Sequence, residues 1–367
     1  MAKLGMYIQQ VRGVSYKPAD VRNKNDSEAV PILRANNIDD GILNFDDLVY
    51  VDRARVKQEQ LLKQGDILLC ASSGSKKLVG KAAQVENSIS YSFGAFCKVV
   101  RTESNLQGYM GHFFQSPYYR AKISQSSEGA NINNIRSNDI DSLDIDIPSQ
   151  EECNARVAEL DRLSYLILKR REQLQCFDDL VKSQFIEMFD AKGFPEKTLD
   201  QMSIGKGEYG AQSASIPYVN NRPRYVRITD INEDGTLNDD IVSSINEDDD
   251  ISYKLEEGDF LFARMGATVG KTYAYQGGNE IFAGYLIRYK LNRRIIEPRY
   301  LFWFTKTPAY LNWVKLNQSG AAQPGINAKK YGSLRVPVPP IELQNEFARF
   351  VDQTDKSKNT YELEVAA

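Results

Sequence analysis

The longest uninterrupted pattern in this chain is a heptad-like spacing of apolar residues between positions 149 and 190, a segment without proline or glycine. Apolar residues that recur every three or four positions, with charged residues between them, favour one face of an α-helix. Ser149 followed by Glu152 is typical of a helix-starting capping box, and Gly193 and Pro195 mark the end. The apolar positions are Val157, Leu160, Leu163, Ile167, Leu174, Phe177, Val181, Phe185 and Met188.

At a rise of 1.5 Å per residue this helix would be about 60 Å long, which suits a spacer better than a small globular domain. A shorter helix is predicted after Pro339-Pro340, with an apolar stripe that includes Leu343, Phe347 and Val351. Because an apolar stripe needs a partner, we expect the two helices to pack against each other in antiparallel fashion.

The chain around the long helix repeats itself. Gly65-Asp66 and the apolar residues after it return as Gly258-Asp259, and residues 31–38 return at the same offset as 224–231. Val79-Gly80-Lys81 returns as Val269-Gly270-Lys271 with little drift. Such a periodic return indicates a duplicated structural unit.

The repeat and the helices together predict an α+β fold of two similar mixed α/β units. Long antiparallel coiled-coil helices separate the units and give the chain a pseudo-twofold organisation. The expected domains are a first unit at 1–148, a central spacer helix at 149–192, a second unit at 193–339 and a distal helix at 340–367.

The second repeat contains Gly270-Lys271-Thr272, which ends as a nucleotide-binding P-loop does. A P-loop has four residues between its glycines and opens a helix. Only three residues separate Gly266 from Gly270, and the residues after Lys271 favour a strand and a turn. We therefore expect a β-hairpin with a glycine-bearing basic loop in both repeats, and a nucleotide hydrolase is the weaker alternative.

Composition narrows the possible chemistry. The chain has four scattered cysteines and one histidine, His112, so we expect no metal site, no histidine-based catalytic triad and no cofactor. The acidic run at 247–250 is interpreted as a solvated loop. No apolar run is long enough for a membrane span and the start does not resemble a signal peptide, which favours a cytoplasmic protein without membrane contact.

The formal net charge is −3, whereas proteins that bind nucleic acid through charge alone are usually basic. A role with nucleic acid therefore requires local basic patches or positive charge from a partner.

The order and duplication of these motifs resemble the specificity (S) subunit of type I DNA restriction–modification systems. The resemblance spans essentially the whole chain. It is carried by the doubled Gly-Asp strand with its following Gly-Lys, by residues 336–344 entering the distal helix, and by residues 184–189 closing the central one.

The resemblance implies two target recognition domains that each read half of a split sequence in double-stranded DNA. It implies that the helices act as a ruler and as the dock for two methyltransferase (M) subunits, which methylate adenine. Restriction (R) subunits would cut unmodified DNA, and this chain would itself be non-catalytic. Two alternatives stay open: the specificity chain of a type IIB-like restriction enzyme, and a coiled-coil adaptor that does not bind DNA.

Candidate DNA contacts are side chains that can bind phosphates or base edges from extended loops. The hairpin loops are the first choice, the matched strand positions are the second, and one glutamine lies in a loop before a closing strand. The predicted contacts are Ser73, Lys76, Lys77 and Lys81 in the first loop, Arg264, Thr268 and Lys271 in the second, and Arg34, Asn36, Arg227 and Gln323 elsewhere.

Overall fold

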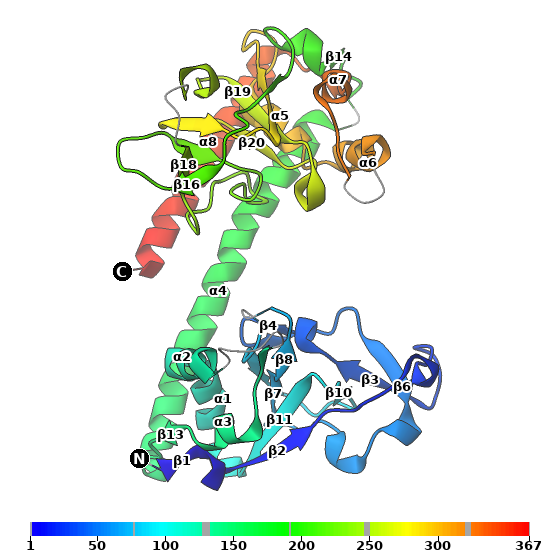
Figure 1. Ribbon diagram of the computed structural model, residues 1–367, viewed down its shortest axis with the longest axis vertical. Coiled ribbons are helices and arrows are strands. Elements are labelled where there is room, and N and C mark those ends of the chain that lie inside the picture. The colour runs from blue at the N-terminus through cyan, green and yellow to red at the C-terminus, as the bar shows by residue number, and fades with distance from the viewer. Residues whose placement is uncertain are drawn as a thin grey trace. The chain divides into compact units, whose positions relative to one another are not determined.

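The computed structural model describes residues 2–75, 78–126, 133–190, 192–245, 250–319 and 324–366. The chain divides into two compact units, residues 1–168 and 169–367, and the division falls inside helix α4 (Gln150–Phe189) (Figure 1). Among the described residues, no helix combines the length and apolarity that a bilayer span requires.

The first unit is built on a four-stranded antiparallel sheet in the order β2-β11-β7-β9. A parallel pair, β3 and β10, lies beside β6 in a second sheet. The strands are β1 (Ala2–Lys3), β2 (Ile8–Arg12), β3 (Ala29–Leu33), β4 (Ile38–Asp39), β5 (Ile42–Leu43), β6 (Val49–Asp52), β7 (Ile67–Cys70), β8 (Ser72–Ser73), β9 (Ala82–Gln84), β10 (Ser92–Phe93), β11 (Cys97–Thr102), β12 (Asn133–Asn134) and β13 (Asp144–Ile145), and the helices are α1 (Gln107–Gln115), α2 (Pro117–Ser126) and α3 (Ser137–Asp141).

The second unit repeats this topology. Its four-stranded antiparallel sheet has the order β15-β22-β19-β20, and β17 and β21 form the matching parallel pair. The strands are β14 (Glu196–Thr198), β15 (Glu208–Tyr209), β16 (Ser215–Pro217), β17 (Arg224–Val226), β18 (Ser243–Ile245), β19 (Asp259–Ala263), β20 (Thr272–Ala274), β21 (Glu280–Phe282), β22 (Leu286–Lys290) and β23 (Arg335–Pro337), and the helices are α5 (Pro298–Phe304), α6 (Pro308–Asn317), α7 (Ala328–Gly332) and α8 (Ile341–Ala366). The prediction of two similar mixed α/β units is confirmed.

The repeated Gly-Asp pair is a turn that starts the central strand of each sheet. Gly65 and Gly258 adopt φ values of 84° and 93°, which favour glycine. Asp66 accepts a hydrogen bond from the Lys63 amide at 2.9 Å, and Asp259 accepts the equivalent bond from the Glu256 amide at 2.9 Å. Both carboxylates are buried and face an arginine of the neighbouring strand, Arg101 in the first unit and Arg288 in the second.

Helix α4 is one continuous helix, as the apolar spacing predicts. The predicted capping box is present: the Glu152 amide donates to Ser149 Oγ at 3.3 Å, and the Ser149 amide donates to Glu152 Oε2 at 3.2 Å. Its first turns pack on the first unit, where Cys153 is buried and His112 Nε2 lies 2.7 Å from Asp161 Oδ1.

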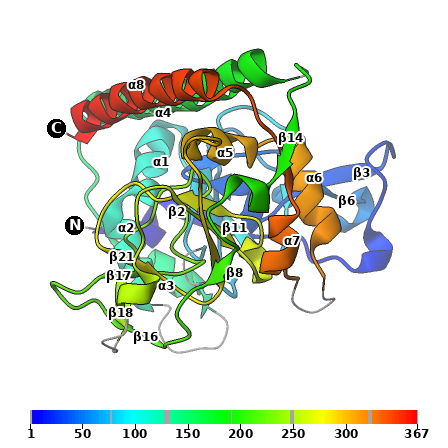
Figure 2. The ribbon, with the colours of Figure 1, turned by 90° about the horizontal axis from the view of Figure 1, so that it is seen from above.

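The C-terminal half of α4 packs against α8 in antiparallel fashion, and Figure 2 shows the two helices side by side. Phe347 of α8 lies between Phe185 and Phe189 of α4. Its ring centroid is 5.4 Å from that of Phe185 and 5.5 Å from that of Phe189. Further along, Lys358 binds Asp178 at 2.8 Å. Tyr361 Oη donates to Gln173 at 2.9 Å, and the Arg170 guanidinium lies 4.2 Å from the Tyr361 ring.

The expected antiparallel pairing of the two helices is confirmed, but it does not reach the N-terminal half of the apolar stripe. Leu160, Leu163 and Ile167 remain 38%, 50% and 48% exposed. The physical reason is length: α8 has 26 residues and α4 has 40, so antiparallel pairing that begins at Phe347 and Phe189 reaches the end of α8 near residue 170.

We predict that Phe347→Ala lowers the free energy of unfolding of the second unit by about 3–5 kcal/mol, because the cavity left among the α4 rings cannot fully close. Both tryptophans, Trp303 and Trp313, lie in this unit, so urea unfolding followed by tryptophan fluorescence reports it. The control is Ile186→Ala on the exposed side of α4, which should change stability by about 0.5 kcal/mol or less. Equal effects of the two substitutions would contradict the packing role of Phe347.

Candidate nucleic-acid interface

The Gly-Lys segments lie in antiparallel hairpins, β7–β9 and β19–β20, as predicted. In the second unit a 3₁₀ turn, Gly266–Thr268, is followed by strand β20 rather than by a helix. The Thr272 hydroxyl is buried and shares a 2.8 Å hydrogen bond with Thr305. This segment therefore lacks the helix N-terminus and the free hydroxyl with which a P-loop holds a nucleotide and magnesium.

The hairpin lysines form matched ion pairs with a second loop. Lys81 Nζ lies 3.8 Å from Asp39, and Lys271 Nζ lies 2.8 Å from Glu233. The two acids occupy equivalent turns that end in Gly41 and Gly235, both with positive φ. Because the carboxylates are largely exposed, these pairs are weak, and a polyanion can compete for the lysines.

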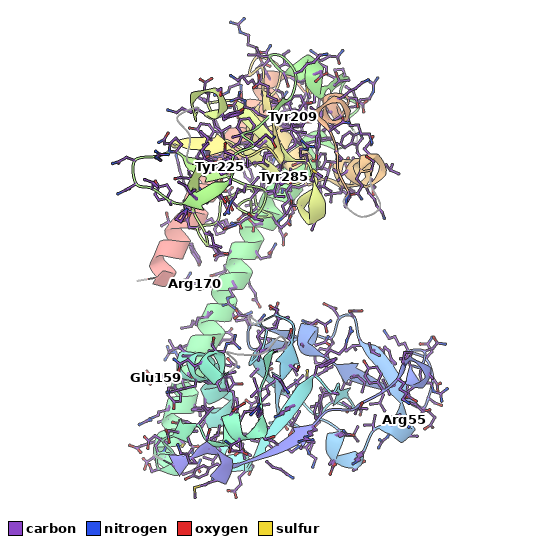
Figure 3. All side chains as sticks on the ribbon, viewed as in Figure 1. Arg55, Glu159, Arg170, Tyr209, Tyr225 and Tyr285 are labelled. Carbon is purple, nitrogen blue, oxygen red and sulfur yellow. The ribbon has the colours of Figure 1, made fainter. Side chains whose placement is uncertain are left out.

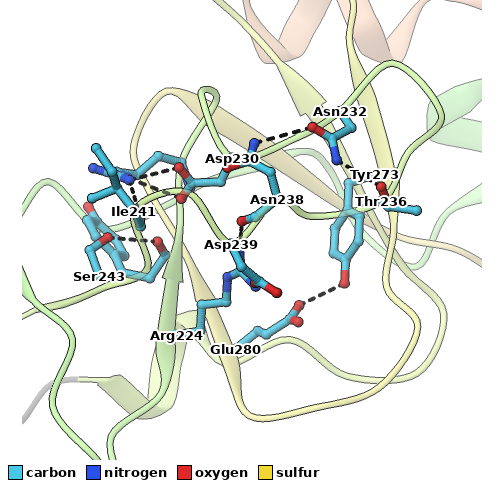
Figure 4. Close-up of polar contacts among 12 residues, drawn as sticks. Arg224, Asp230, Asn232, Thr236, Asn238, Asp239, Ile241, Ser243, Tyr273 and Glu280 are labelled. Atoms are coloured by element: carbon cyan, nitrogen blue, oxygen red, sulfur yellow. Dashed lines mark hydrogen bonds and ion pairs between the residues drawn. The ribbon is translucent and has the colours of Figure 1, made fainter. Parts of the chain in front are cut away.

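Arg34 and Arg227 occupy matched positions, but both are engaged within their own unit. The Arg34 amide donates to Asn37 Oδ1 at 2.9 Å, and the Arg227 amide donates to Asp230 Oδ2 at 3.0 Å. Arg34 Nη2 donates to Asp47 at 2.8 Å. Arg227 Nη2 donates to Asp230 Oδ1 and to the Ile241 carbonyl, each at 2.8 Å; Figure 4 labels these two acceptor residues. These guanidinium groups hold their loops in shape.

The remaining predicted contacts differ in their surroundings. The Arg264 guanidinium lies 4.7 Å from the ring of Tyr209, while the Thr268 hydroxyl donates to the Met265 carbonyl at 3.3 Å. Ser73 Oγ accepts from the Ser75 amide at 3.1 Å, and exposed Asn36 reaches Asp47 only at 3.4 Å. Lys76, Lys77 and Gln323 lie outside the described residues, as do residues 247–249 of the acidic run.

A pocket of about 430 Å³ opens beside Arg227 in the second unit. Gln212, Thr229 and Tyr285 line it as well, and Figure 3 shows Tyr209, Tyr225 and Tyr285 on this unit. Sequence reasoning did not single out Gln212 and Tyr285, which lie in loops outside the matched segments, and it used Thr229 only as part of the repeated segment 224–231. The signal was a pair of aromatic residues, Phe96 and Tyr285, just before equivalent strands.

The buried acid Glu280 has a structural role, because its contacts lie inside the second unit. Tyr273 Oη donates to Glu280 Oε2 at 2.9 Å, and burial raises the pKa of Glu280 while the Tyr273 bond and Arg224 oppose the rise (Figure 4). Both side chains are buried, so a substrate cannot reach them. Within the described ranges, His, Cys, Asp and Glu side chains nowhere gather in groups of three or more that could hold a metal ion.

Comparisons with known proteins agree with this architecture. A family model described as "Type I restriction modification DNA specificity domain" matches residues 202–365. The chain is 30% identical to the type I restriction enzyme EcoKI specificity subunit of Escherichia coli (strain K12), over 97% of this chain and 82% of that protein. It is 28% identical to the StySPI specificity subunit of Salmonella potsdam, over 97% and 81% of the two chains.

Among solved structures, the S subunit of a type I restriction–modification system from M. genitalium matches with a TM-score of 0.51. The match covers 99% of this chain and 91% of that one at 13% identity, so it speaks for the fold alone. The duplicated topology, the long helix and near-full-length similarity to curated relatives lead to one assignment: this chain belongs to the family of type I restriction enzyme specificity subunits.

Proposed function

We propose that this chain is the sequence-specific DNA-recognition subunit of a cytoplasmic type I restriction–modification complex. Residues 1–148 and 193–339 act as target recognition domains that read the two halves of a split target. Residues 149–192 act as the spacer and 340–367 as the distal helix. The observation that carries the proposal is the repeated strand order, with a matched hairpin lysine and acid pair in each unit.

The hairpin loops meet the DNA in this proposal. Lys81 and Lys271 exchange their carboxylate partners for phosphates, and Arg264, Thr268, Ser73 and Asn36 supply further polar contacts. The acids lower the local positive charge while no DNA is bound, in keeping with the net charge of −3, and a well-placed phosphate displaces them. Arg34 and Arg227 keep their bonds to Asp47 and Asp230 and so hold the loops in shape. The guanidinium N–H groups that these bonds do not use are the ones that contact DNA.

The unpaired apolar face of α4 supports docking of methyltransferase (M) subunits, which carry out adenine methylation, with restriction (R) subunits joining for cleavage. Leu163, Leu166 and Ile167 are about half exposed and share one stretch of the helix. A contiguous exposed apolar patch on a helix is typical of a protein–protein contact. The chain itself contributes recognition and no catalytic residue.

The experiment that tests the proposal directly is a map of methylated adenines in the host genome with and without this gene. We expect one split target, methylated on both halves, whose modification disappears on deletion and returns on complementation. Cutting on both sides of that target would identify the type IIB-like alternative. A methylation map unchanged by deletion would favour the adaptor that does not bind DNA.

We also predict that Lys271→Ala weakens target binding by the complex severalfold and lowers the slope of log affinity against log salt concentration by about 0.9, the loss of one phosphate contact. Lys81→Ala should do the same in the first unit. The matched control is Lys290→Ala: Lys290 also forms an exposed pair, with Glu256 at 3.6 Å, but lies at the opposite end of the β19–β22 pair. An unchanged salt slope in both hairpin variants would remove these lysines from the interface.

For the docking face, we predict that the double substitution Leu163→Glu and Ile167→Glu reduces co-purification of the methyltransferase subunits at least tenfold, because it places two charges in an apolar contact. The control is Leu316→Glu, an equally drastic change of an exposed leucine on α6. Normal assembly of the double variant would show that the M subunits dock elsewhere.

A further inference from the structure

Each unit exposes one large aromatic ring at the same place in its fold. Phe96 is 71% exposed and immediately precedes β11, and Tyr285 is 54% exposed and immediately precedes β22. The residues that follow them, Cys97 and Leu286, are buried. The side chain is Phe in one copy and Tyr in the other, but it has the same place in the fold and is exposed in both.

The backbone of both rings is fixed to the hairpin that carries the predicted DNA contacts. The Ala71 amide donates to the Phe96 carbonyl at 2.9 Å, and the Arg264 amide donates to the Tyr285 carbonyl at 3.0 Å. Ala71 directly follows β7, whereas Arg264 directly follows β19. The two aromatic residues are therefore attached to the first loop residue of equivalent hairpins.

A second backbone segment packs against the turn that precedes each of these strands, and a glycine in that segment, Gly13 or Gly210, allows the two backbones to lie close together. A Cβ atom on Gly13 would lie 2.1 Å from the Gly94 carbonyl oxygen, and one on Gly210 would lie 2.3 Å from the Phe282 carbonyl oxygen. The next residues complete the contact: Val14 donates its amide to Phe93 at 2.7 Å, and Ala211 donates to Phe282 at 2.9 Å. Each ring thus projects from a turn held on both sides.

Polar and basic side chains surround Tyr285. It lines the pocket that also contains Gln212, Arg227 and Thr229, and the neighbouring Arg264 stacks on Tyr209. In the first unit the Ser72 amide also donates to the Phe96 carbonyl, at 3.0 Å, which ties that ring to strand β8 and Ser73. An exposed aromatic ring on a fixed backbone can make an apolar contact with a base edge, such as a thymine methyl group, in the groove of a duplex.

We propose that Phe96 and Tyr285 are a duplicated pair of nucleobase-contacting residues, one ring packing against a base in each half of the target. The inference rests on the proposed function and adds to it a contact that does not depend on charge. Each recognition unit then has one aromatic residue that contacts a base and one lysine that contacts a phosphate.

The test uses the full chain in complex with its methyltransferase subunits and a duplex that the wild-type complex selects from a randomised pool. We expect Phe96→Ala and Tyr285→Ala each to weaken binding about tenfold, in keeping with loss of one contact to a base pair of duplex DNA. The slope of affinity against salt should stay unchanged, unlike that of Lys271→Ala. Tyr285→Phe and Phe96→Tyr, which keep the ring, should bind as the wild type does.

A repeated selection separates the two halves: Phe96→Ala should relax base preference in one half-site only, and Tyr285→Ala in the other only. The matched controls are Tyr118→Ala and Tyr218→Ala, exposed aromatic residues at positions that are not repeated, which should leave binding unchanged. Phe96→Gln and Tyr285→Gln, which keep bulk and remove the ring, decide the question if the alanine variants lose their fold.

If the alanine variants bind as tightly as the wild type and select the same sequence, this inference is overturned and the proposed function still stands. Loss of affinity with a changed salt slope and an unaltered selection would also overturn it, because the rings would then act through the backbone contacts. Failure of the wild-type complex to select any sequence would instead overturn the proposed function.

Discussion

The packing of Phe347 between Phe185 and Phe189 is the contact on which the second unit most depends. These rings belong to the large core of that unit, together with Tyr300, whose ring centroid lies 4.8 Å from that of Phe189. The cluster joins the end of α4, the start of α8 and helix α5 in one core. This core therefore fixes the C-terminal end of α4 in the second unit.

The hairpin lysines show how an acidic chain can present a basic contact. Lys81 and Lys271 are each paired with a carboxylate from a separate glycine turn of the same unit. The pair is exposed, so it contributes little to folding, but it lowers the local excess of positive charge. In the proposed function these lysines exchange a carboxylate for a phosphate, so binding depends on geometry as much as on net charge.

The aromatic pair and the Gly-Asp turns illustrate two uses of one duplicated framework. The Gly-Asp turn begins the central strand, and its buried carboxylate holds an arginine of the next strand, so its repetition follows from folding. The exposed rings contribute no such packing. Folding therefore explains why the Gly-Asp turn is repeated, but it does not explain why the exposed ring is repeated. This difference supports a role of the rings in binding.

Local pattern alone determined a large part of this structure. The helix over 150–189 follows from its apolar spacing and the absence of proline and glycine, and the hairpins follow from a Gly-Asp turn next to an apolar strand. The duplication followed from matched segments at a nearly constant offset. These features depend on interactions between residues close in sequence, or on comparison of the chain with itself.

Tertiary structure decided the rest, because the partners are far apart in the chain. Asp39 and Glu233 meet their lysines some forty residues later, and Asp47 and Asp230 occupy the arginines that sequence reasoning assigned to DNA. The apolar stripe of α4 gives no sign of where α8 stops covering it, since that depends on where the antiparallel contact begins. The rings of Phe96 and Tyr285 look like core residues in the sequence, and only the turn that holds them places them at the surface.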